Sequence, residues 1–69
     1  MTLLVGYRER VARIETEARR LARSGQHSGF RSIERALFAG GYREASRVFA
    51  NRWTQHELDR LCEQAQRER

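Results

Sequence analysis

Apolar residues recur along the first third of the chain at alternating spacings of three and four. This spacing places them on one face of an α-helix, whereas a half-buried strand needs alternation at every second residue. The apolar positions are Leu4, Tyr7, Val11, Ile14, Ala18 and Leu21. Ser24-Gly25 ends the pattern, because glycine suits the left-handed position that follows a helix. We therefore expect a long helix over residues 4–23, about 30 Å in length at 1.5 Å per residue.

The rest of the chain continues the same helical period in three shorter segments, over residues 29–39, 42–50 and 55–67. Their apolar faces comprise Phe30, Ile33 and Leu37; Tyr42, Ala45, Val48 and Phe49; and Leu58, Leu61, Cys62 and Ala65. No strand-like alternation or internal repeat interrupts them. The sequence predicts one all-α domain over residues 1–69, a small bundle of about four helices. It has a long N-terminal helix, a short helical hairpin and a C-terminal helix.

Local sequence signals also predict where two of these helices begin. Ser28 is suited to cap the helix over 29–39, because its hydroxyl can accept from a free backbone N–H. Thr54 and Glu57 fit a capping box for the last helix, and Trp53 and Leu58 have the spacing of a hydrophobic staple. Trp53 is accordingly expected to be buried.

With 69 residues, the chain can bury only a small core. A domain of this size hides about 60% of the surface that its unfolded chain exposes. Self-association or a partner is therefore expected to contribute to its stability. The single cysteine excludes an internal disulfide and suits a reducing, cytoplasmic compartment. The short apolar patch over residues 1–5 has the length and flanks of neither a secretory signal nor a membrane span.

Positive charge is spread along the chain. It has 14 arginines, no lysine and a net charge of +5, and the excess lies over residues 1–53 rather than in one arm. Arg31, Arg35, Arg43 and Arg47 recur at one-turn spacing on the two central helices. They are candidates for contact with phosphates or with a partner's carboxylates, which arginine binds with two parallel hydrogen bonds. The alternative is an ordinary solvated face, with Arg31–Glu34 and Glu44–Arg47 pairs formed locally.

The two central helices also resemble a helix-turn-helix in part. Ala36, Gly40 and Phe49 fit the usual small, glycine and apolar positions, but Ser46 stands where an apolar residue is expected. A simple helical hairpin accounts for the same residues. Phe38 projects about 80° from the Phe30–Leu37 stripe at 100° per residue. It either covers the hairpin turn or is an exposed aromatic anchor for a partner.

Groups that could support catalysis are sparse. His56 and Cys62 lie about 240° apart around a helix, so they do not form a thiol–imidazole pair. Cys62 is interpreted as a small core residue, and His27 and His56 as solvent-exposed. We predict no enzyme activity, cofactor, metal or small-molecule substrate.

The long first helix allows two interpretations. It either lies along the other helices within one chain or pairs through its apolar face with a second copy. The candidates for self-association are Leu4, Tyr7, Val11, Ile14, Ala18 and Leu21. A homodimer through this helix would be antiparallel, since that sets Arg8 and Arg10 against Glu15 and Glu17.

Two functions remain open at this stage. The first is a small non-enzymatic regulator or adaptor that binds another protein, and a homodimer is its expected form. The alternative is a small DNA- or RNA-binding regulator that uses the two central helices and their arginines. Neither requires a membrane.

Overall fold

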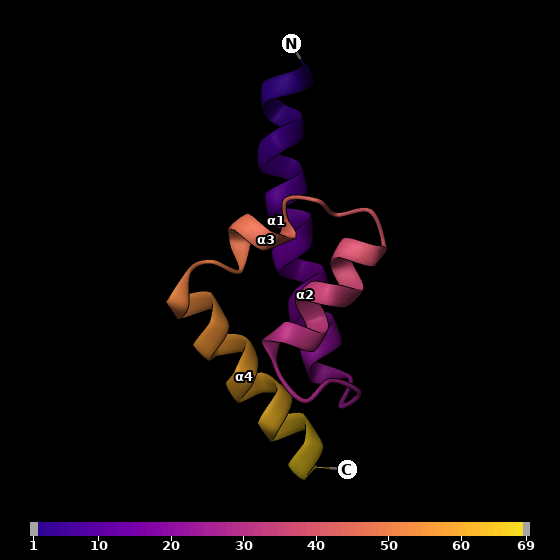
Figure 1. Ribbon diagram of the computed structural model, residues 1–69, viewed down its shortest axis with the longest axis vertical. Coiled ribbons are helices and arrows are strands. Elements are labelled where there is room, and N and C mark those ends of the chain that lie inside the picture. The colour runs from indigo at the N-terminus through magenta and orange to yellow at the C-terminus, as the bar shows by residue number, and fades with distance from the viewer. Residues whose placement is uncertain (1, 69) are drawn as a thin grey trace.

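The computed structural model describes residues 2–68, and the side chains of residues 6–68. This part of the chain folds into four helices and contains no strand (Figure 1). They are α1 (Thr2–Arg23), α2 (Phe30–Ala39), α3 (Ala45–Val48) and α4 (Arg52–Arg67). The expected all-α bundle with a long first helix is confirmed.

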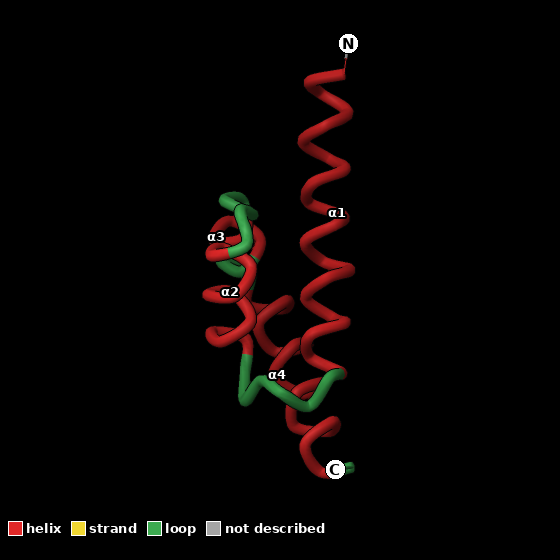
Figure 2. The backbone as a smooth tube through the Cα atoms, turned by 90° about the vertical axis from the view of Figure 1, so that its right-hand side faces the viewer, coloured by secondary structure: helices red, strands yellow, loops and turns green. Residues whose placement is uncertain are grey.

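Helix α1 is the helix on which the other three pack. It contacts each of the other three helices, and α2 also contacts α3 and α4. The molecule is elongated, with extents of 44 × 21 × 16 Å. Figures 1 and 2 both show the first turns of α1 extending past the other helices, which pack on its C-terminal part. The N-terminal turns of α1 therefore have neighbours on fewer sides than its C-terminal turns.

One small hydrophobic cluster joins the four helices. Its buried members are Ile14, Ala18, Ala22, Ile33, Leu37, Ala45, Phe49, Leu58 and Cys62. The helical period predicted all of them except Ala22. Alanine at two successive turns of α1 lets neighbouring helices approach closely, because the side chains at a contact set the distance between helix axes. No polar or charged residue in the described range is fully buried, so burial of apolar side chains holds the fold together.

The capping residue predicted for α2, Ser28, is wrong. Gly29 is the N-cap residue of α2, and glycine has no side chain that could accept a hydrogen bond there. Instead the backbone N–H of Phe30 donates to Oδ1 of Asp59, on α4, at 2.9 Å. A residue 29 positions further along the chain therefore replaces Ser28 as the acceptor.

The predicted start of α4 is also wrong. The helix begins at Arg52, where the side chain of Asn51 accepts from the backbone N–H of Trp53 at 2.8 Å. Thr54 thus lies inside the helix and is not its cap. Trp53 is 79% exposed, so the expected staple with Leu58 does not form.

The central hairpin is tighter than expected. Helix α3 spans only Ala45–Val48, not 42–50. Gly41 has φ of +101°, a conformation that suits glycine, and the N–H of Tyr42 returns to the carbonyl of Leu37 at 3.0 Å. A helix of four residues is about 6 Å long. The hairpin interpretation therefore describes this region, and α3 is too short to lie along a DNA groove as a recognition helix does.

Candidate functional site

The four candidate arginines are all exposed, and three of them line two different hollows. Arg31 and Arg35 line a hollow with Glu34, Phe38 and Ser46. Arg47 lines a different hollow, beside α1, and Arg43 lines neither of the two. The guanidinium of Arg31 also lies 5.9 Å from the centre of the Phe30 ring, within range of a cation–π contact. Arg31 and Arg35 are thus the two of the four that line a common hollow, and a joint role for all four stays a prediction.

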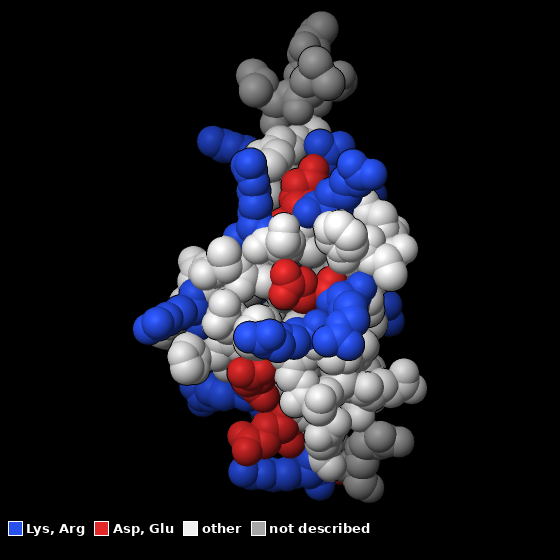
Figure 3. Space-filling model, viewed as in Figure 1, with Lys and Arg blue, Asp and Glu red and all other residues white. Residues whose placement is uncertain are grey.

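The predicted local ion pairs of these arginines are absent from the described residues. Glu44 pairs with Arg10 of α1 at 3.0 Å and not with Arg47, and no Arg31–Glu34 pair forms in the described part of the chain. On the face drawn in Figure 3, acidic side chains lie among the basic ones at several levels. The basic charge on that face is consequently interrupted and forms no continuous patch.

Phe38 is 57% exposed and lies in the hollow with Arg31 and Arg35. More than half of this residue is therefore exposed, and its role as an anchor for a partner stays a prediction. The pair of arginines and this ring form an exposed surface on α2, here called the α2 surface.

The self-association candidates on α1 divide into two groups. Ile14 and Ala18 are buried in the core of the single chain, at 0% and 1% exposure. Leu21 packs against that core and is partly buried. The surface of the folded chain therefore does not offer Ile14 and Ala18 to a second copy, and for these two the interpretation within one chain is correct. The side chain of Leu4 lies outside the described residues.

Tyr7 and Val11 remain accessible, with 43% of Tyr7 exposed and Val11 partly exposed. Together with Glu15 they line a hollow of about 290 Å³ between α1 and the segment from α3 to the start of α4. The opposite wall consists of Arg47, Val48, Asn51 and Thr54. We call this the α1 hollow.

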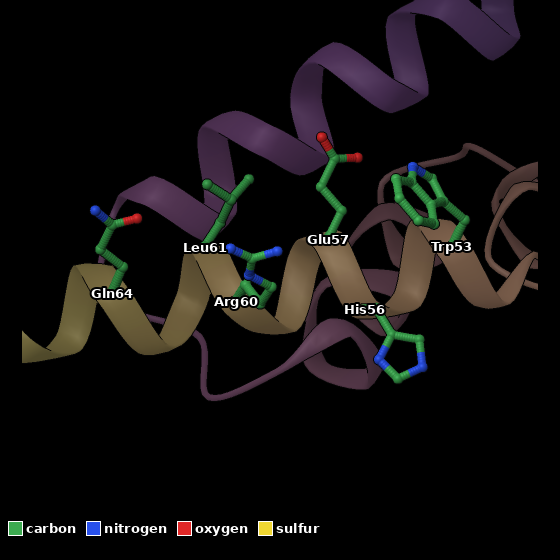
Figure 4. Close-up of a pocket in the computed structure, with 6 residues that line it drawn as sticks. All are labelled: Trp53, His56, Glu57, Arg60, Leu61 and Gln64. Carbon is green, nitrogen blue, oxygen red and sulfur yellow. The ribbon is translucent and has the colours of Figure 1, made fainter.

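A second hollowed surface, with both apolar and polar residues, follows α4 where it lies against α1. Trp53, Glu57 and Leu61 rise from α4 on the side of α1, and His56 points away (Figure 4). These residues border a hollow of about 300 Å³, together with Arg60 and Gln64. A neighbouring hollow is lined by Arg23, Ala65 and Glu68 and shares Leu61 and Gln64 with the first. The two form one groove from Trp53 to Glu68, here called the α4 groove.

An ion pair crosses from this groove to α1. The Nε atom of Arg19 lies 3.5 Å from a carboxylate oxygen of Glu57. Both side chains are well exposed, so the pair contributes little to stability, within about 1 kcal/mol. The relative position of α1 and α4 is therefore held by the buried apolar cluster and not by this pair.

Sequence reasoning missed this groove because it assigned Trp53 to the buried staple. The signal that could have found it is the Asn51 side chain, since asparagine is among the best N-cap residues. A helix that begins at Arg52 includes Trp53 in its first turn, on the stripe of Glu57 and Leu61.

The histidines and the cysteine lie apart and have different environments. His27, expected to be solvent-exposed, is half-buried, and its Nδ1 lies 2.7 Å from Oγ of Ser32. The carbonyl of His27 also accepts from the amide of Gln66 on α4 at 3.1 Å. Burial raises the pKa of the Cys62 thiol, and the nearby Asp59 carboxylate raises it further. The thiol is therefore protonated at neutral pH and a poor nucleophile.

The described residues lack two further features. They hold no cluster of three or more His, Cys, Asp or Glu side chains that could bind a metal ion. None of their helices combines the length and the apolar character needed to cross a membrane.

Comparison with protein-family models, with curated proteins and with solved structures finds no match to this chain.

Proposed function

We propose that this chain is a small, non-enzymatic, protein-binding regulator or adaptor, whose contact surface is the α4 groove. The observation that carries the proposal is Trp53, 79% exposed at the head of the groove. A single free cysteine suits work in a reducing, cytoplasmic compartment.

Burial of the exposed Trp53 side chain against a partner is favourable. Its ring carries about 150–250 Å² of surface, and burying most of it stabilises a complex by on the order of 3 kcal/mol. Tryptophan is also the residue type most enriched among the few interface positions that dominate binding energy. Leu61 lies about two helical turns after Trp53 and adds a second apolar contact in the same groove.

The shape of the α4 groove favours an amphipathic helix of the partner as its occupant. From Trp53 to Glu68 the groove follows about 22 Å of helix at 1.5 Å per residue, or four turns. A partner helix binds such a groove through apolar side chains spaced three and four residues apart. Arg23, Glu57 and Glu68 at its border supply charges of both signs for orientation.

Affinity capture with the folded chain tests this function. The immobilised chain is incubated with a lysate of the source organism, and each captured protein is purified and titrated against wild type and two aromatic variants. Trp53→Ala should weaken binding by about 30-fold, the effect of losing about 2 kcal/mol. The matched control, Phe38→Ala, removes an exposed aromatic residue outside the groove and should leave the affinity within about threefold. Equal binding by wild type and Trp53→Ala, with unchanged helix content, would refute the proposal.

A second function, binding of single-stranded nucleic acid, is favoured by the α2 surface. Arg31 and Arg35 are placed to contact phosphates, and Phe38 offers an exposed ring on which a base can stack. Two phosphate contacts on a single strand predict a log–log salt slope of about −1.4. Gel shifts at two salt concentrations test it, with Arg43→Ala as the control for Arg31→Ala and Arg35→Ala. No retardation at low salt would exclude this function.

A further inference from the structure

The three α1 residues of the α1 hollow form a stripe whose chemistry is self-complementary. Tyr7, Val11 and Glu15 are spaced by four residues and line the same hollow. A phenol, which donates a hydrogen bond, lies at one end, a carboxylate, which accepts, lies at the other, and an apolar side chain separates them. A copy of the stripe running in the opposite direction would match it end to end.

We propose that the occupant of the α1 hollow is a second copy of this chain, paired through antiparallel N-terminal halves of α1, with the two-fold axis at Val11. The inference rests on the proposed function, because it names the partner of a second protein-binding surface beside the α4 groove. A two-fold interface uses the same patch on both copies, so every contact occurs twice.

The register follows from the axis. With Val11 opposite Val11, Tyr7 of each copy lies at the level of Glu15 of the other, and its hydroxyl donates to that carboxylate. The exposed ring of Tyr7 then enters the other copy's hollow, against the wall of Val48 and Thr54. A parallel pair would instead set Glu15 against Glu15, and like charges in contact are unfavourable.

Ion pairs within the chain determine which charged side chains of α1 remain available to pair with the other copy. Arg10 is engaged by Glu44 at 3.0 Å, and Glu17 by Arg20 at 2.6 Å. The sequence-based expectation of Arg10 and Glu17 as contacts between copies therefore gives way to one pair, Arg8 with Glu15. Arg8 is exposed and follows Tyr7, on the flank of the helix that also carries Glu15.

The proposal also explains the extension of α1 past the other helices in Figures 1 and 2. In this register residues 2–20 of the two copies run side by side, over about 28 Å of helix. The first turns of α1, which have few neighbours in the single chain, then lie along the other copy.

Sedimentation equilibrium from micromolar to millimolar concentration measures the association. Tyr7→Glu places a carboxylate against Glu15 of the other copy and should weaken dimerisation at least tenfold, as a close like-charge contact at a desolvated site does. The double variant Tyr7→Glu with Glu15→Arg converts this repulsion to attraction and should recover part of that loss, because the arginine introduced at position 15 also faces Arg8 of the other copy. Arg13→Glu, on the opposite side of α1, is the control and should change the dissociation constant by less than about threefold.

Disulfide trapping tests the direction of the pairing. Val11→Cys lies on the axis and should form a cross-linked dimer on oxidation. Tyr7→Cys should not, because the two positions are then about 12 Å apart along the helix, beyond the reach of a disulfide. The unsubstituted chain is the background control, since its Cys62 is buried.

The outcomes separate this inference from the proposed function. A wild-type chain that stays monomeric at millimolar concentration, or a Tyr7→Cys variant that forms a cross-linked dimer, would overturn the antiparallel dimer. If Trp53-dependent partner binding persists in that case, only the inference fails. If partner binding is also independent of Trp53, the proposed function fails with it.

Discussion

The contact between Asp59 and the start of α2 allows a direct test of how the fold is assembled. Oδ1 of Asp59 accepts from the N–H of Phe30 at 2.9 Å, at the positive end of a helix of ten residues. Such a short helix is not stable alone, so the cap and the packing must maintain it. Asp59→Ala removes the acceptor and the negative charge together.

The expected loss can be worked from these two contributions. An N-cap side chain contributes about 1 kcal/mol, and a negative charge at a helix N-terminus about 0.5 kcal/mol. Asp59→Ala should therefore destabilise the chain by about 1.5 kcal/mol and lower Tm by roughly 6–12 °C. Asp59→Asn keeps an acceptor and should lose only about 0.5 kcal/mol. Ser28→Ala, the cap favoured by local sequence, should have little effect.

Thermal and urea unfolding followed by circular dichroism measures these differences, and Gly29 completes a double-mutant cycle. A Cβ at Gly29 would lie 3.1 Å from Oδ1 of Asp59, so Gly29→Ala disturbs the cap without backbone strain. Its cost should fall by about 0.5 kcal/mol or more when Asp59 is already alanine. The reasoning is refuted if Ser28→Ala costs as much as Asp59→Ala, or if Gly29→Ala costs the same in both backgrounds.

Three further predictions concern the same fold. Gly41→Ala should destabilise by about 1 kcal/mol, because Gly41 has φ of +101°, while Gly6→Ala, in open space on α1, should stabilise by up to about 1 kcal/mol in urea unfolding. Asn51→Ala should cost about 1 kcal/mol by the same assay, because it removes the cap of α4; no change would contradict the cap. The raised pKa of the Cys62 thiol stabilises the fold below the ordinary thiol pKa, and this contribution is lost as pH rises through the raised value. Unfolding measured against pH should therefore show an alkaline decline that is reduced in Cys62→Ala.

The helices and most of the core were predictable because both depend on local geometry. An apolar side chain every three or four residues marks one face of a helix wherever that helix packs. Ile14, Ile33, Leu37 and Leu58 were assigned correctly on this ground alone. Ala22 was missed because its burial depends on how closely other helices approach α1.

The caps and charge pairs were not predictable in the same way, because local and distant partners compete for the same groups. Ser28 is adjacent to α2, yet Asp59 of α4 supplies the acceptor. Glu44 could pair within its own segment, yet it reaches Arg10 on α1. Hydrogen bonds and exposed ion pairs differ by only about 1 kcal/mol between alternatives, so packing decides among them.

The exposure of Trp53 shows the same division at the candidate site. The sequence by itself determined that this ring lies near the start of the last helix and that an apolar stripe follows it. Only the tertiary structure decided that Leu58 and Cys62 are buried while Trp53 is left in solvent. The physical reason is that a periodic pattern specifies which residues share a face, whereas the position of the neighbouring helix determines how much of that face is covered.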